Sequence, residues 1–186
     1  MLVVNKILVS RDFSDVSDRV LYHGIALAAK MKARLYVLHV ADKQDGPYPG
    51  RDLPAVRAEL RQAGAISEEA LESVVIEGVT RQGDNVADTV CQYADEQGID
   101  LIALGTHGRR GLQRILLGSV AEAVIRRAGC PVLTVRGEGT SDVEASSQIE
   151  RILVPVDFSE YAREASRVAM EWAKLHDAQV DLLHVV

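Results

Sequence analysis

The chain has 186 residues, of which 47% are hydrophobic and 26% charged, a composition typical of globular proteins. No apolar run approaches the roughly 18 to 20 residues that a membrane-spanning helix needs. The 27 acidic and 21 basic residues give a net charge of -6, which disfavours broad binding to nucleic acid. The N-terminus lacks the basic and apolar regions of a signal peptide, so we expect a cytoplasmic protein with no membrane partner.

Short apolar runs alternate with longer segments of helical spacing, which is typical of an α/β protein with a doubly wound parallel sheet. The five predicted strands are Lys6–Val9, Arg34–Val40, Glu77–Gln82, Asp100–Leu104 and Val132–Val135. Their largely unbroken apolar character predicts a sheet that helices cover on both faces.

Four helices are predicted between these strands. They are Val16–Lys32, capped by Ser14 or Asp15; Leu53–Val75, with a break at Gly64; a helix that Asp84 caps and that ends near Gly98; and Ser119–Ala128, closed by Gly129 and Pro131.

The last strand, Val132–Val135, is predicted to be an edge of the sheet. A second copy of the chain that pairs with this edge would satisfy its backbone groups, so we expect a homodimer.

The sequence contains an internal repeat, because residues 6–40 align without a gap on residues 151–185 at an offset of 145. Eleven of these 35 positions are identical, and they include the clusters Asp12-Phe-Ser14 with Asp157-Phe-Ser159. The repeat predicts a complete domain over 1–137, a polar linker over 138–149, and half of a second domain over 150–186. Such a half is too small to be stable alone, so it docks, swaps with another chain, or belongs to a truncated tandem protein, which we favour.

The stretch after the fourth predicted strand carries Gly105, Gly108 and Gly118, with Ser119 at the start of the last predicted helix. In doubly wound sheets, ligands bind beyond the carboxyl ends of the strands, where this stretch begins. Glycines let backbone amides approach a phosphate, and the first amides of a helix hold an anion. The stretch therefore predicts a phosphate-binding loop. On spacing alone an alternative stays open, a tight turn followed by a helix that Ser119 merely caps.

Several kinds of chemistry are disfavoured. The loop has no lysine in a P-loop position, and no Gly-x-Gly-x-x-Gly follows the first strand, so neither a motor ATPase nor a Rossmann dehydrogenase is expected. No histidine, carboxylate or lysine is obviously poised as a general base, so we predict no catalytic residue. Cys91 and Cys130 are predicted to be inert core thiols, and no metal ligands are predicted.

Five segments together carry a resemblance to a known family: Ile7–Ser14, Leu38–Val40, Gly83–Asp84, Asp100–Gly108 and Cys130–Val135. In these segments the first domain resembles a universal stress protein, and Ile152–Ser159 resembles the opening of a second such domain. The family's nucleotide-binding group carries Gly-x2-Gly-x9-Gly-Ser/Thr, which the loop matches at every spacing. The resemblance implies a fold like that of the adenine nucleotide alpha hydrolases, with flavodoxin-like layering. It also implies ATP as the cofactor, with or without magnesium.

The resemblance also implies the site. Asp12 and Val40 would hold the adenosine end, and the glycine loop with the first amides of the last helix would hold the phosphates. The predicted nucleotide-binding residues are Ser10, Asp12, Val40, Gly105, His107, Gly108, Arg109, Gly118, Ser119 and Val120. The family usually has a proline two positions before the aspartate, as Pro155 stands in the second copy, whereas the first copy has Ser10 followed by the charged Arg11.

Some of these residues have a second interpretation. Asp12 is either a ribose contact or a turn residue whose carboxylate is satisfied by backbone amides. His39, which recurs as His184, is predicted to be a hydrogen-bonded core residue. His107 and Arg109 either contact the phosphates or lie solvated on the surface.

Three functions follow from these observations. The sequence favours an ATP-binding regulatory protein that acts in the stress response through nucleotide-dependent conformation or partner binding, with slow or no hydrolysis. A nucleotide-hydrolysing or nucleotidyl-transferring enzyme is the first alternative, and a pairing module that binds no nucleotide is the second.

Overall fold

The structure is a computed structural model that describes residues 3–41, 54, 57–58, 61–62, 67–106, 117–136 and 149–185. The chain divides into two compact units, Val4–Ser147 and a smaller unit that holds Gln148–Val186. The larger unit contains a five-stranded sheet and the smaller one a two-stranded sheet.

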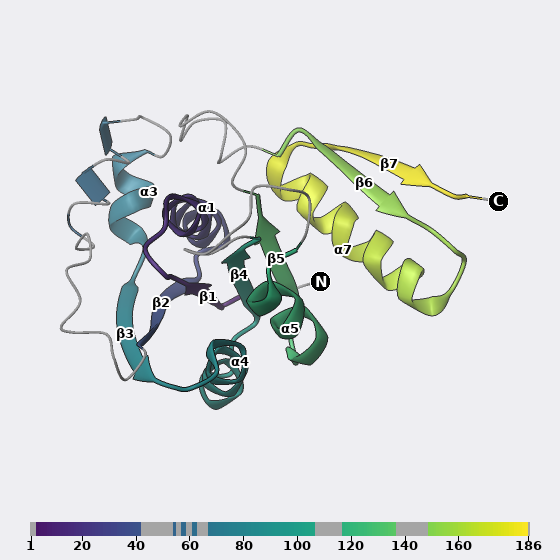
Figure 1. The fold of residues 1–186 in the computed structure, drawn as a ribbon. Helices are drawn as coiled ribbons and strands as arrows, with labels where there is room; N and C mark the ends of the chain where they lie inside the picture. The colour runs from purple at the N-terminus through teal and green to yellow at the C-terminus, as the bar shows by residue number, and fades with distance from the viewer. Residues whose placement is uncertain are drawn as a thin grey trace. The chain divides into compact units, whose positions relative to one another are not determined.

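The five strands of the larger unit run parallel in the order β3-β2-β1-β4-β5 (Figure 1). They are β1 (Lys6–Ser10), β2 (Arg34–Ala41), β3 (Ile76–Gln82), β4 (Leu101–Gly105) and β5 (Val132–Val135). The predicted doubly wound sheet is therefore confirmed, with every strand boundary within one residue of its predicted place. The chain builds outward from β1 through β2 and β3, and then adds β4 and β5 on the other side of β1. The strand order thus reverses between β1 and β4.

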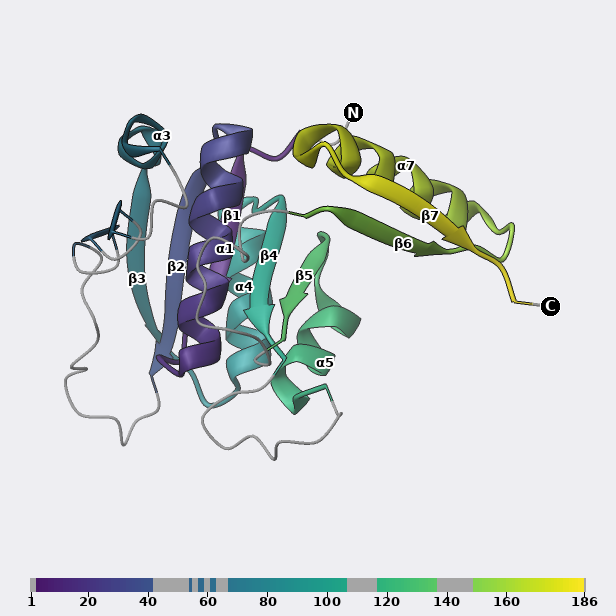
Figure 2. The same ribbon diagram turned by 90° about the horizontal axis from the view of Figure 1, so that it is seen from above.

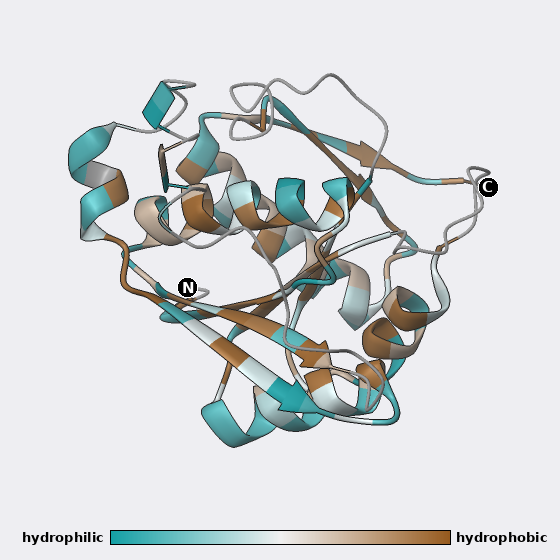
Figure 3. Cartoon of the chain, turned by 60° about the vertical axis from the view of Figure 1, so that its left-hand side comes forward, coloured by the Kyte–Doolittle hydropathy of each residue, from teal (hydrophilic) through white to brown (hydrophobic). Residues whose placement is uncertain are grey.

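Helices cover both faces of this sheet (Figure 2). On one face lie α1 (Asp15–Met31) and α3 (Glu68–Ser73), and on the other lie α4 (Val86–Gln97) and α5 (Ser119–Arg127). The middle of the central strand β1 is completely buried, because Ile7, Leu8 and Val9 are all 0% exposed. Figure 3 shows hydrophobic residues both on the strands and on parts of the helices that pack around them. No helix in the described part of the chain is both long and apolar enough to cross a membrane.

The strand β3 departs from the predicted two-sided burial. It lies at the edge of the sheet, and its residues are exposed except for Ile76 and Val79, which are half-buried. An edge strand has a neighbour on one side only, so its faces are covered less completely than those of β1.

Three predictions about helix ends are wrong. Asn85, not Asp84, caps α4, because its side chain accepts a hydrogen bond from the Asp88 amide at 3.2 Å. The predicted helix Leu53–Val75 ends as α3 at Ser73, since Val75 already pairs with β2 through its carbonyl, and its predicted break at Gly64 lies outside the described residues. The helix α5 ends at Arg127, where Ala128 takes an extended conformation, so Gly129 is not the cap.

The smaller unit repeats the opening of the larger one at the offset of 145. Its elements are β6 (Arg151–Pro155), α7 (Glu160–His176) and β7 (Gln179–Leu183), with β6 and β7 parallel. The left-handed backbone conformations after the two first strands also coincide, because Phe13 has φ 67° and Phe158 has φ 64°. The sequence repeat is therefore also a structural one, although Leu153, the counterpart of the buried Leu8, is 62% exposed.

Candidate functional site

Those predicted site residues that the structure describes lie where the parallel strands end, at the carboxyl ends of β1, β2 and β4 and at the start of α5. Ser10 is the last residue of β1 and pairs with Leu38 of β2, two residues before Val40. Gly105 is the last residue of β4, the strand beside β1. Because the strand order reverses between β1 and β4, the connections that leave these two strands diverge to opposite faces. A doubly wound sheet opens a crevice for a ligand at such a point.

The two ends of the glycine loop are joined by a hydrogen bond. The Gly118 amide donates to the Thr106 carbonyl at 2.7 Å, and the Thr106 amide donates to the Val135 carbonyl of β5 at 3.0 Å. The start of α5 is thereby held beside the end of β4, with Thr106 buried between them. His107, Gly108 and Arg109 lie outside the described residues.

The first turn of α5 presents backbone amides that the helix itself does not use. The first bond within the helix runs from the Glu122 amide to the Gly118 carbonyl at 2.9 Å, so the amides of Ser119 and Val120 precede the helical ladder. Gly118 is the N-cap and makes no side-chain cap bond, so the alternative in which Ser119 caps the helix is wrong. Both Ser119 and Val120 are exposed, and the positive end of the helix dipole favours an anion there.

Asp12 is anchored in the turn between β1 and α1. Its Oδ1 atom accepts a hydrogen bond from the Ser14 amide at 3.1 Å and another from the Ser14 hydroxyl at 2.6 Å. Ser14 in turn caps α1 by accepting from the Ser17 amide at 3.3 Å. The turn role considered for Asp12 is therefore real, and a carboxylate with two oxygens has the capacity to hold a hydroxyl as well.

His39 is the hydrogen-bonded core residue that the sequence predicts. It is 7% exposed, and its Nδ1 atom lies 3.0 Å from the Arg11 carbonyl oxygen. The same pair recurs in the second copy, where Nδ1 of His184 lies 2.7 Å from the Val156 carbonyl oxygen.

Sequence reasoning missed two residues at this edge. Thr106 was not singled out, although its backbone joins β5 and α5 at the mouth of the loop. Arg11 entered only as a departure from the family pattern, yet it is 4% exposed and paired with Asp18 of α1. The sequence does hold one signal for Arg11. In the repeat, the apolar Val156 stands at the equivalent position, so a charged residue there is a difference between the two copies.

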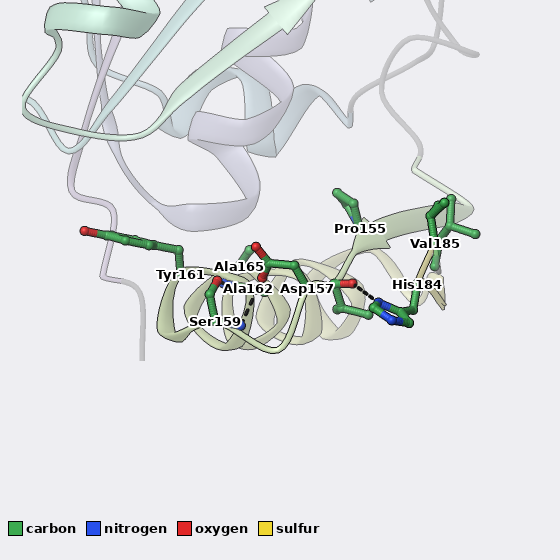
Figure 4. A pocket seen from close by; sticks show the side chains of 10 residues that line it. Pro155, Asp157, Ser159, Tyr161, Ala162, Ala165, His184 and Val185 are labelled. Atoms are coloured by element: carbon green, nitrogen blue, oxygen red, sulfur yellow. Dashed lines mark hydrogen bonds between the residues drawn. The ribbon is translucent and has the colours of Figure 1, made fainter.

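The second copy has a hollow at the same edge of its own sheet (Figure 4). The hollow has a volume of about 480 Å³ and is lined by residues from the ends of β6 and β7 and from the start of α7, among them Pro155, Asp157, Ser159 and Val185. Asp157 and Val185 are the counterparts of Asp12 and Val40. Hydrogen bonds from the Ser159 hydroxyl and amide lower the pKa of the Asp157 carboxyl, so it is held as the anion.

The two cysteines are free thiols, with Cys91 buried and Cys130 half-buried. Burial raises the pKa of both thiols, and the charge of Asp95 raises it further, which makes them poor nucleophiles. Within the described ranges, no group of three or more histidine, cysteine or carboxylate side chains is arranged to hold a metal ion.

The fold is that of a doubly wound α/β protein, and the described candidate site residues lie at the carboxyl ends of its central strands and at the start of α5. The model of the universal stress protein family matches residues 4–136 and 148–186, so the chain belongs to that family. Universal stress protein MJ0531 of Methanocaldococcus jannaschii is 36% identical over 151 residues, which cover 70% of this chain and 81% of the relative.

Two solved structures are also similar. A universal stress protein solved in complex with cAMP is 26% identical, with a TM-score of 0.53, and the match covers 73% of this chain and 99% of that one. A universal stress protein from Archaeoglobus fulgidus shares the fold over 98% of this chain and 68% of its own, with a TM-score of 0.68 and 24% identity.

Proposed function

We propose that this protein binds ATP at the carboxyl ends of β1, β2 and β4, beside the start of α5. We also propose that it acts as a regulatory protein of the stress response. Nucleotide binding would change its conformation or its affinity for a partner, with slow hydrolysis or none. Asp12 and Val40 would hold the adenosine end, and the first amides of α5 would hold the phosphates.

The observation that carries this proposal is the hydrogen bond between the Gly118 amide and the Thr106 carbonyl. It holds the uncapped start of α5 beside the end of β4, on the side of the sheet where the strand order reverses. A helix start with free amides and a carboxylate after β1 would then both contact the ligand, as the phosphates and the sugar of a nucleoside polyphosphate require. The family relationship and the relative solved with cAMP add support for an adenine nucleotide as the ligand.

An enzymatic function is the first alternative, and the test separates it by rate. A turnover above about 1 per second would be typical of an enzyme rather than of a regulatory protein. The second alternative is a pairing module that binds no nucleotide. It predicts that the purified protein carries no nucleotide and that added ATP does not bind.

The experiment uses heat to release any small molecule bound to the purified protein, identifies it, and then titrates ATP by calorimetry. We expect an adenine nucleotide from the wild type and a loss of ATP binding in Gly118→Val. The φ of -60° and ψ of 147° at Gly118 are open to any residue, so a valine there tests the close approach of phosphate rather than backbone strain. Ser119→Ala is the matched control, because it keeps the amide and removes only the hydroxyl. A wild type that neither retains nor binds an adenine nucleotide would contradict the proposal.

We also infer a tandem organisation and a dimer. Residues 1–137 would form one family domain and 150–186 the first part of another, joined by 138–149, which is consistent with the two ranges that the family model matches. The edge strand β5 would pair with the same strand of another molecule of this chain.

Whether magnesium accompanies the nucleotide is a separate outcome of the ATP titration, run with and without the metal.

A further inference from the structure

The turn between β1 and α1 is held by a buried arginine. The Arg11 side chain is 3% exposed, and its Nε and Nη2 atoms donate to the same Oδ1 atom of Asp18, at 3.0 Å and 2.7 Å. Its guanidinium carbon also lies 4.6 Å from the centre of the Phe13 ring. Arg11 therefore ties the end of β1 to the first turns of α1 and to an aromatic ring two residues further along.

The backbone on both sides of Asp12 is fixed by further contacts. The Arg11 amide donates to the Leu38 carbonyl at 2.8 Å, and the Arg11 carbonyl lies 3.0 Å from Nδ1 of His39. The Phe13 ring packs against the His39 ring with centres 4.6 Å apart. Asp12 thus stands between Arg11, whose carbonyl contacts His39, and Phe13, whose ring contacts both the Arg11 guanidinium and the His39 ring.

The second copy supplies a comparison within the same chain. At the positions of Arg11 and Asp18 it has Val156 and Arg163, yet its turn has the same left-handed phenylalanine and the same histidine contact. The backbone turn therefore forms without the ion pair. What differs is exposure, because Phe158 is 72% exposed and Asp157 is exposed, whereas Phe13 and Asp12 are half-buried.

A buried ion pair is poor evidence of added stability, since apolar residues of similar volume often serve equally well or better. Fixing a binding group before the ligand arrives has a different benefit, because the ordering cost of binding is then already met. We propose that the Arg11–Asp18 pair is a positioning device that holds the Asp12 carboxylate oriented for a hydroxyl of the ligand's sugar. This inference rests on the proposed function, because the sugar is that of the nucleotide.

The test installs the second copy's residues in the first, as Arg11→Val together with Asp18→Arg. The second copy shows that this pair is compatible with the turn, so the variant should fold. Calorimetry with adenosine and with ATP should show that both ligands bind about tenfold more weakly, by the same factor, because the device acts at the sugar and not at the phosphates. Arg11→Lys keeps the charge without the two-nitrogen contact and should fall between the wild type and the double variant.

Two results would overturn the inference. A loss for ATP alone, with adenosine unchanged, would mean that Arg11 acts as a charge on the phosphates. Unchanged affinity for both ligands, with a lower melting temperature, would mean that the pair serves the fold only.

A second readout separates this inference from the proposed function. The amides of Ser14 and Ser17 donate within the turn, so their hydrogen exchange should be faster in the double variant than in the wild type. A wild type that binds neither ligand would end the proposed function, and the exchange rates would still decide whether Arg11 holds the turn. Unchanged exchange would contradict the positioning role in either case.

Discussion

Gly24 is the residue that lets α1 lie close to β1. A Cβ atom built on Gly24 would come within 2.5 Å of Cγ2 of Val9 and 3.4 Å of Cδ1 of Leu35. Both neighbours are 0% exposed, so neither side chain has free space to move into. The glycine is therefore required for packing, and it keeps the helix against the strand whose end carries Asp12.

We predict that Gly24→Ala lowers the free energy of unfolding by about 1 to 3 kcal/mol, the usual cost of overpacking a core. This happens although alanine is the better helix former by about 1 kcal/mol. Urea denaturation of the wild type and the variant measures the change. In a Val9→Ala background the contacting methyl is gone, so Gly24→Ala should cost much less there. An equal cost in both backgrounds would contradict the close contact.

Residue patterns predicted part of the site, because a carboxylate after a strand and glycines before a helix are local features. They placed Asp12 at the end of β1 and Gly118 before α5, where the structure has them. They did not show that Arg11 is buried, because the cover comes from Asp18 in the next helix and from Phe13 on a left-handed backbone. Burial of a charged side chain depends on such contacts, which spacing along the chain does not reveal.

At the scale of whole elements, the strands were predictable and the helix ends were less so. A strand between covered faces needs an apolar run, and such a run is visible in the sequence. A cap depends on which of two neighbouring polar residues takes the extended backbone conformation. Asp84 and Asn85 both suit the cap of α4, and the structure gives that place to Asn85 at φ -130° and ψ 110°.

We predict that Asn85→Ala lowers the free energy of unfolding by about 1 kcal/mol, because the Asp88 amide loses its acceptor. Asn85→Ser is the matched control, since a serine hydroxyl also caps, and it should stay within a few tenths of a kcal/mol of the wild type. Thermal or urea denaturation of the three proteins gives the comparison. An alanine variant with the same free energy of unfolding as the wild type would show that the Asn85 side chain does not cap α4.

At the scale of the whole molecule, the sheet order leaves β5 as the last strand of the larger unit. The carbonyls of Pro131 and Val135 accept from Ile102 and Thr106, so the alternating residues 131, 133 and 135 face β4. Val132 and Thr134 then direct their backbone groups away from the sheet. In the proposed dimer, β5 of another molecule of this chain would pair with these groups.

We predict a two-fold dimer at micromolar concentration, measured by size-exclusion chromatography with light scattering. Thr134→Pro removes one outward amide and leaves the bonds to β4 in place, so it should convert the dimer to a monomer without unfolding the sheet. A wild type that is monomeric at this concentration, or a proline variant that remains a full dimer, would contradict pairing through β5.

The most direct test of the account is an amide NMR titration of the wild-type chain with ATP, because it reports where the ligand binds. We predict that the largest shifts fall on Asp12 and Ser14 after β1, on Val40, on Gly105 and Thr106, and on Ser119 and Val120 at the start of α5. Saturating ATP that leaves these amides unmoved, or that shifts only residues far from this edge of the sheet, would contradict the nucleotide site.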